Sequence, residues 1–175
     1  MTLTQKIVAI HEALSRGGQP HAFGGALALA WCTGRARATI DIDINVFVTA
    51  DAVDDVMGAL PAGVEHTDKD CAVARREGQV RLWWEHTPVD LFLNTTEFHQ
   101  AVADRVRWET FMERPMPFLS CLDLAVFKAF FNRTKDWADL EEMEAAGTLD
   151  VERVTAILIG FLGADDERIG HLRTL

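Results

Sequence analysis

The sequence predicts an α+β protein with a mixed α/β sheet and a C-terminal helical region, on three observations. Residues 37–48 alternate between apolar and polar side chains, as a half-buried strand does. Strand-like and helix-like patterns interleave through the first two thirds of the chain, and the last third has helical spacing only. We therefore expect a core over residues 1–114 and a helical region over residues 115–175 packed on that core.

The N-terminal part predicts a helix, a short strand and a second helix. Apolar residues are spaced for a helix over residues 4–15. A short apolar strand is expected at residues 21–23 and a buried helix at residues 26–32. Gly24 and Gly25 lie between these two elements, where they make a turn or let the backbone approach a ligand closely.

The strand predicted within residues 37–48 has two different faces. Its apolar face carries Ile40, Ile42, Ile44 and Val46, and its polar face carries Thr39, Asp41, Asp43 and Asn45. Asp41 and Asp43 lie one pleat apart, about 7 Å along the strand. Two carboxylates at this distance repel each other unless a cation lies between them. The alternative is the solvent-facing side of an edge strand.

The middle of the chain predicts further strands and helices. A helix is expected over residues 52–60, and a hairpin over residues 71–84 with its turn at residues 77–78. A strand follows at residues 89–93, and a helix at residues 97–106. These segments complete the expected sheet-containing core.

The C-terminal third is expected to be helical after two prolines, Pro115 and Pro117, interrupt regular structure. A relaxed capping box at residues 120–123 opens the first of these helices. The other expected helices begin at Thr134 and cover residues 150–162 and 165–172.

A third carboxylate, Asp90, interrupts the apolar strand at residues 89–93. If this strand lies beside the strand of Asp41 and Asp43, the three side chains share one face. Carboxylate oxygens are the ligands that hard cations such as Mg²⁺ prefer. Three carboxylates beside a glycine loop are typical of a two-metal site for phosphoryl transfer.

Several motifs occur together in one order, and each is short. They are Gly24-Gly25 before a helix, Arg-x-Thr-x-Asp-Ile-Asp at residues 37–43, Val-Asp-Leu at residues 89–91, and two C-terminal segments at residues 119–128 and 133–139. The set resembles the nucleotidyltransferase fold shared with DNA polymerase β. Within that fold it is similar to the minimal AbiEii-type nucleotidyltransferases, the toxins of type IV toxin–antitoxin systems. The likeness spans roughly residues 23–140.

The resemblance implies a catalytic metal site. Asp41, Asp43 and Asp90 would ligate Mg²⁺, and Asp90 would also help to deprotonate the attacking hydroxyl. The implied reaction moves a nucleoside monophosphate from an NTP such as ATP to a hydroxyl and releases pyrophosphate. The acceptor would be a tRNA 3′ end, a protein side chain or a small molecule, and a cognate antitoxin is a candidate partner.

The resemblance also implies nucleotide contacts, and each has a structural alternative. The candidate residues are Gly24, Gly25, Arg37, Thr39, Lys128 and Lys135. A lysine suits the β- and γ-phosphates because it is a compact point charge. Lys128 is alternatively a surface lysine whose stem lies on an apolar helix, and Lys135 is alternatively solvated. Arg37 is alternatively a structural partner of Asp43 or Asp90.

Three other side chains, those of Asp136, Asp139 and Trp83, allow a functional and a structural interpretation each. Asp136 and Asp139 lie at the start of a helix, where carboxylates complement the helix dipole without catalysis. Trp83 shares a strand face with Arg81 and would stack on a nucleobase, although packing within the protein is the preferred interpretation.

Composition narrows the choice of partners. The 175 residues include 17 basic and 27 acidic side chains, a formal net charge of −10, which argues against broad DNA or RNA binding. No segment resembles a signal peptide or approaches the roughly 18 apolar residues of a membrane span. Cys32, Cys71 and Cys121 form no recognisable disulfide or metal framework, so we expect a reducing cytoplasm and no membrane association.

Two other functions remain open at this point. One is a catalytically inactive protein of the same fold that binds a partner, as an antitoxin or regulator does, since an acidic surface suits a basic protein. The other is an aminoglycoside-type nucleotidyltransferase, since an acidic cleft suits a polycationic small molecule. An enzyme should bind nucleotide in a metal-dependent way, whereas the inactive protein should not. The identity of the acceptor distinguishes the aminoglycoside-type enzyme from the other nucleotidyltransferases.

Overall fold

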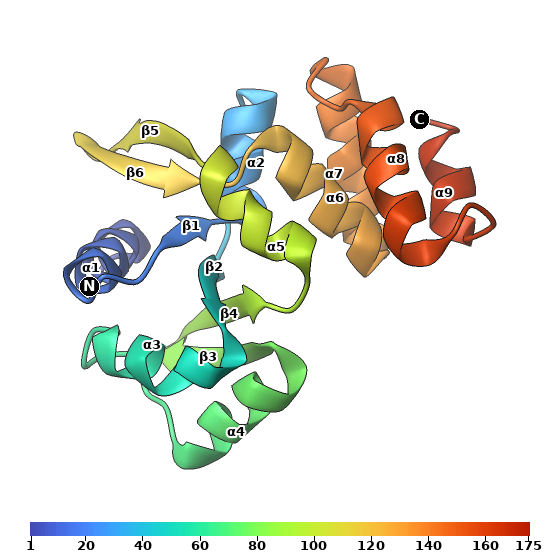
Figure 1. The fold of residues 1–175 in the computed structure, drawn as a ribbon. Helices are drawn as coiled ribbons and strands as arrows, with labels where there is room; N and C mark the ends of the chain where they lie inside the picture. Colours follow the sequence, from blue (N-terminus) through green and yellow to red (C-terminus); the bar gives the residue numbers. More distant parts are fainter. The chain divides into compact units, whose positions relative to one another are not determined.

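The computed structural model describes residues 1–175, which form nine α-helices, two short 3₁₀ helices and a six-stranded sheet (Figure 1). The chain divides into two compact units. The first comprises residues 1–27 and 38–119, and the second comprises residues 28–37 and 120–175. We call them the sheet unit and the helical unit.

The sheet unit is built on strands in the order β3-β4-β2-β1-β6-β5. The strands are β1 His21–Phe23, β2 Ile42–Thr49, β3 Gln79–Trp84, β4 Thr87–Asn94, β5 Arg107–Phe111 and β6 Arg114–Phe118. β2 runs parallel to β4 and antiparallel to β1, and β1 runs parallel to β6. β3–β4 and β5–β6 are antiparallel pairs. The sheet is therefore mixed, as the sequence predicted.

The apolar face of β2 forms part of the core, as the alternating pattern predicted. Ile42, Ile44 and Val46 are fully buried, and Val89 and Leu91 of β4 lie beside them. Ile40 was expected on this face and is instead 73% exposed. The reason is that the pairing with β4 begins at Ile42, so Ile40 precedes the sheet and no neighbouring strand covers it.

Helices flank the sheet within this unit. They are α1 Leu3–Arg16, α3 Val53–Ala59, α4 Asp68–Glu77 and α5 Glu97–Val102, with the 3₁₀ helices η1 Ala50–Ala52 and η2 Ala103–Arg105. α4 lies against β3, and α5 contacts β2 and β4 (Figure 1). α2 Gly25–Thr33 begins in the sheet unit and continues into the helical unit.

The hairpin predicted over residues 71–84 does not form, because the first half of this segment belongs to α4. Thr67 and Asp70 form a capping box that starts this helix, and Gly78 ends it with a left-handed φ of 68°. Residues 77–78 are therefore a helix end and not a hairpin turn. The real hairpin joins β3 to β4 and has Glu85 at positive φ.

The prolines do not interrupt the chain as expected, because Pro115 and Pro117 lie inside β6. The two prolines are two residues apart, so the backbone positions that lack an N–H group both face the same edge of β6. On that edge β1 pairs with β6 only through Phe23 and Phe118. The other edge pairs with β5, which the sequence did not predict, through five residue pairs.

The helical unit contains α6 Cys121–Phe131, α7 Thr134–Ala145, α8 Val151–Leu162 and α9 Glu167–Leu172, as expected. Side chains of Ser120, Asp150 and Asp166 cap three of these helices. The buried apolar residues of this unit include Leu124, Ala129, Leu140, Met143, Leu158 and Ile169. None of the helices in the chain combines the length and the apolar character needed to cross a bilayer.

The sequence predicted no disulfide, whereas the structure contains one. Cys32 of α2 and Cys121 at the start of α6 form a disulfide within the helical unit, and Cys71 is free and buried. The two bonded cysteines are 89 residues apart, so their spacing carried no sequence signal. The disulfide attaches the C-terminal half of α2 to the helical unit.

Candidate functional site

The structure brings the three predicted carboxylates to one face of the sheet. Asp43 of β2 and Asp90 of β4 are direct neighbours in the register of the two parallel strands. Residues in register on adjacent strands point to the same face of a sheet. Asp41 lies one residue before β2, and its carboxylate shares a cation with Asp90. We call Asp41, Asp43 and Asp90 the carboxylate cluster.

A cation that sequence reasoning did not assign lies at this cluster. Arg81 of β3 is opposite Asp90 in the antiparallel pair. Its Nε and Nη2 donate to the two carboxylate oxygens of Asp90 over 2.7 and 2.6 Å. The same Nη2 lies 3.7 Å from Oδ2 of Asp41. The hydrogen bonds to Asp90, together with the charges of Asp41 and Asp43, raise the pKa of Arg81.

Apolar and polar residues alternate in the sequence around Arg81, and this alternation corresponds to the two faces of β3. Val80, Leu82 and Trp84 are buried, whereas Arg81 and Trp83 lie on the opposite face. Trp83 is 46% exposed, so the preferred interpretation of it as a packed residue is wrong. An indole and a guanidinium therefore stand two residues apart on the strand that borders Asp90.

The glycine pair lies directly beside the cluster. The Gly24 N–H donates to the backbone carbonyl oxygen of Asp43 over 2.9 Å. Gly25 has a φ of 53° and starts α2. A Cβ atom at Gly25 would lie 1.9 Å from Oδ2 of Asp43, so no other residue fits without moving that carboxylate. Gly25 is thus required by the close approach of the Asp43 carboxylate, whereas a Cβ atom at Gly24 would first meet the side chains of Asn45 and Leu119, at 3.1 and 3.2 Å.

Thr39 shapes the chain just before β2. Its hydroxyl accepts a hydrogen bond from the Asp41 N–H over 3.2 Å and donates to the Asp41 carbonyl oxygen over 3.3 Å. Such local side chain–backbone bonds stabilise a turn. Thr39 therefore supports the backbone that carries Asp41.

The donor chemistry of the cluster fits a divalent cation. Three carboxylates supply only oxygen ligands, which hard divalent cations prefer, and Asp43 and Asp90 are in register on adjacent strands. No group of three or more His, Cys, Asp or Glu side chains in the structure converges as a ready-made metal site. At this cluster the guanidinium of Arg81 lies against Asp90 and Asp41 instead.

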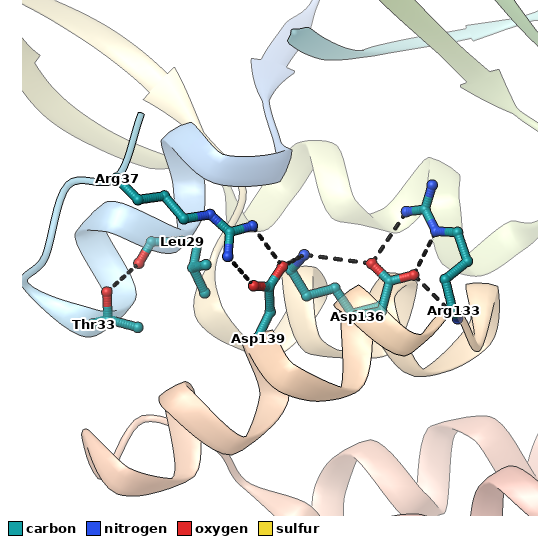
Figure 2. Close-up of polar contacts among 7 residues, drawn as sticks. Leu29, Thr33, Arg37, Arg133, Asp136 and Asp139 are labelled. Atoms are coloured by element: carbon teal, nitrogen blue, oxygen red, sulfur yellow. Dashed lines mark hydrogen bonds and ion pairs between the residues drawn. The ribbon is translucent and has the colours of Figure 1, made fainter. Parts of the chain in front are cut away.

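The other predicted site residues belong to the helical unit, where two of them join a buried ionic network (Figure 2). Arg37 donates two hydrogen bonds to the carboxylate of Asp139. Lys128 donates to Asp139 as well, and its Nζ lies 3.6 Å from Oδ1 of Asp136. Arg37 is thus held by Asp139, which is not one of the partners that the sequence analysis considered.

The carboxylates of this network are almost inaccessible. The side chains of Asp136 and Asp139 are 0% and 1% exposed, and that of Lys128 is 8% exposed. Arg133 adds two hydrogen bonds to Asp136, over 2.6 and 3.1 Å. The surface-lysine interpretation of Lys128 is therefore wrong, whereas Lys135 is exposed on α7.

The nine predicted site residues thus divide between the two units. Those of the sheet unit are Gly24, Gly25, Thr39, Asp41, Asp43 and Asp90, and those of the helical unit are Arg37, Lys128 and Lys135. The carboxylates and the glycine pair are brought together within one unit. Arg81 is the residue of this site that the motifs did not identify.

Comparisons with known proteins identify the fold. No family model matches the chain, and no curated protein matches its sequence. Among solved structures, the antibiotic-resistance factor ANT(2″)-Ia is 16% identical and has a TM-score of 0.65, over 98% of this chain and 97% of that chain. The same protein has also been solved in complex with adenylyl-2″-tobramycin.

Two further solved structures have the same architecture. The lincosamide antibiotic adenylyltransferase LnuA, bound to lincomycin, is 16% identical with a TM-score of 0.56, over 81% of this chain and 96% of that chain. An antigenic nucleotidyltransferase-like protein from Paracoccidioides brasiliensis is 13% identical with a TM-score of 0.53, over 96% and 91%. The chain therefore has the α+β fold of these nucleotidyltransferases.

Proposed function

We propose that this protein is a Mg²⁺-dependent nucleotidyltransferase that moves a nucleoside monophosphate from an NTP to a hydroxyl group. The observation that carries the proposal is the register of Asp43 and Asp90 on adjacent parallel strands, with Gly25 against the carboxylate of Asp43. This arrangement supports a metal–triphosphate site because carboxylates and a glycine loop meet at one place. The fold shared with nucleotidyltransferases supports it independently.

The proposed chemistry is an in-line displacement at the α-phosphorus. The acceptor hydroxyl oxygen forms a bond to this phosphorus, the bond to the β-phosphate oxygen breaks, and pyrophosphate leaves. Asp90 accepts the hydroxyl proton, and Asp41, Asp43 and Asp90 would hold the cation. Bound Mg²⁺ would supply Lewis-acid polarisation and neutralise the developing negative charge.

The nucleotide would be held mainly by backbone and by basic side chains. The Gly24 N–H is bonded to the Asp43 carbonyl oxygen, so the N–H groups offered to the triphosphate would be those of Gly25 and the first turn of α2. Lys135 is exposed and stays a candidate contact to the β- and γ-phosphates. Arg37 keeps 44% of its side chain exposed while paired with Asp139, so it also stays a candidate, whereas Lys128 is buried in its ionic network and is not proposed as a phosphate contact.

A small-molecule hydroxyl is the acceptor that the comparisons favour. ANT(2″)-Ia is described with an adenylylated tobramycin, and LnuA is a lincosamide adenylyltransferase. We therefore propose ATP as the donor and a small basic molecule as the acceptor, since the net charge of −10 favours a cationic partner. The AbiEii-type toxin role, with tRNA or protein as acceptor and an antitoxin as partner, stays a prediction.

The test is nucleotide transfer by the purified 175-residue protein. Each α-labelled NTP is incubated with Mg²⁺ and a panel of aminoglycosides, lincosamides, tRNA and cell extract. We expect labelled product from ATP and a basic small molecule, and none from Asp43→Asn. Asp51→Asn, an exposed aspartate of η1, serves as the matched control and should keep full activity.

The same experiment separates the alternatives. A folded protein that shows no Mg²⁺-dependent ATP binding would favour the inactive binding protein. Transfer to tRNA or protein alone would favour the toxin role. If ATP neither binds nor reacts, and Asp43→Asn behaves as the parent does, the proposal is wrong.

A further inference from the structure

We infer that Arg81 is a displaceable counter-ion of the carboxylate cluster, which competes with the metal for Asp90 and Asp41. In the metal-free protein its guanidinium supplies the positive charge that these aspartates need. When a divalent cation binds, Arg81 must release at least one of them. This inference rests on the proposed function, since it concerns the same cluster.

The first support is the way in which Arg81 occupies the oxygens. Both carboxylate oxygens of Asp90 accept a hydrogen bond from one guanidinium, over 2.7 and 2.6 Å. A bidentate arginine–carboxylate pair is a strong, geometrically specific contact. A metal ion at Asp90 needs an oxygen lone pair on the face of the cluster, and a +1 guanidinium at this distance also repels the cation.

The second support is that one guanidinium serves two aspartates. Nη2 is 2.6 Å from Oδ2 of Asp90 and 3.7 Å from Oδ2 of Asp41. These two carboxylates come from different segments, the loop before β2 and the strand β4. Arg81 therefore bridges two of the three proposed metal ligands, as the metal itself would do.

The third support is that Arg81 is free to leave. It lies on β3, an edge strand of the sheet, and its side chain is 50% exposed, whereas that of Asp90 is 15% exposed. Water screens a half-exposed ion pair and hydrates the guanidinium once it is released, so breaking the pair costs little free energy. Rotation of its long side chain into solvent is sufficient, and no backbone movement is needed.

The competition predicts tighter metal binding when the charge of Arg81 is removed. In Arg81→Gln we expect Mn²⁺, measured without nucleotide by electron paramagnetic resonance, to bind about tenfold more tightly than in the parent. Arg81→Lys keeps a charge but loses the two-pronged contact, so its affinity should lie between the two. Arg76→Gln is the control, because Arg76 is 69% exposed and pairs with Glu77 on α4.

Metal-free stability gives a second readout that activity does not influence. Without its counter-ion the cluster should repel itself, so metal-free Arg81→Gln should unfold at a lower temperature than the parent. Saturating Mn²⁺ should raise its unfolding temperature by more than it raises that of the parent. A folded Arg81→Gln protein that binds Mn²⁺ equally or more weakly than the parent would overturn the inference.

An Asp43→Asn arm separates this inference from the proposed function. If Asp43→Asn abolishes Mn²⁺ binding and Arg81→Gln matches the parent, the metal site stands and the counter-ion role of Arg81 fails. If Asp43→Asn leaves Mn²⁺ binding unchanged, or if the parent binds none, the proposed metal site fails and the inference fails with it.

Discussion

Two aspartate clusters in this molecule are neutralised in opposite ways. In the helical unit, Asp136 and Asp139 are buried and three cations, from Arg37, Lys128 and Arg133, bind them. In the sheet unit, Asp41 and Asp90 share the single guanidinium of Arg81, which is half exposed. The first cluster has more positive than negative charge, and the second has less.

This difference indicates which of the two aspartate clusters can bind a further cation. Buried carboxylates with complete hydrogen bonding have no access for a cation, and breaking such a network leaves an uncompensated buried charge. Carboxylates on an accessible face, with one mobile partner, can exchange that partner for another cation. We therefore assign a structural role to the helical unit's cluster and propose a binding role for the carboxylate cluster.

The largest expected effect comes from breaking the buried network. Asp139→Asn removes the carboxylate that binds both Arg37 and Lys128 and leaves the Lys128 ammonium buried, so it should lower the free energy of unfolding by about 3 kcal/mol. Urea denaturation followed by circular dichroism measures this loss. A loss below about 1 kcal/mol would mean that the network is not structural. A Lys128→Met/Asp139→Leu double variant should lose less than the sum of its single variants.

Acid should act on the other unit, where two buried histidines are held neutral. Burial lowers the pKa of His21 and of His99 to about 4, against 6.5 in the unfolded chain. Between these values the unfolded chain binds more protons, so stability is constant above about pH 6.5 and falls as the pH decreases toward 4. The slope should reach about 1.4 kcal/mol per pH unit for each histidine.

The measurement is urea denaturation at pH 7 and pH 5 for the parent and for His99→Phe. The variant should lose less stability than the parent on acidification, because one of the two titrating groups is gone. Asp139→Asn should keep the parent's pH dependence, since the histidines belong to the sheet unit. Equal pH dependence in parent and His99→Phe would contradict the lowered pKa of His99.

The carboxylate cluster was largely predictable because it follows from strand periodicity. Alternation predicts Asp41 and Asp43 on one face of a strand, of which the structure includes Asp43 in β2 and has Asp41 just before it, and the apolar run around Asp90 indicates a neighbouring central strand. The remaining condition, that Asp90 lies on the same face, is met by its register with Asp43. An alternating pattern predicts the two faces of a strand correctly because the buried face fixes the register of that strand.

The partners of these residues were not predictable, since they depend on contacts between distant segments. Arg81 faces Asp90 only because of the β3–β4 register, and the sequence interpretation gave part of that region to a hairpin that does not form. Arg37 meets Asp139 across 102 residues, and Cys32 meets Cys121 across 89. Local patterns contain no signal for such pairs.

The smallest expected effect on stability comes from Asp90→Asn, the counterpart of Asp139→Asn in the carboxylate cluster. The pair that it breaks is two-pronged, but Arg81 is half exposed and water replaces the lost carboxylate. The free energy of unfolding should therefore change by less than about 1 kcal/mol, as for other solvent-accessible ion pairs. Mn²⁺ and ATP binding should nevertheless be lost, because a neutral amide replaces a proposed metal ligand. A destabilisation as large as that of Asp139→Asn would show that Arg81 and Asp90 form a structural pair, and the contrast between the two clusters would then disappear.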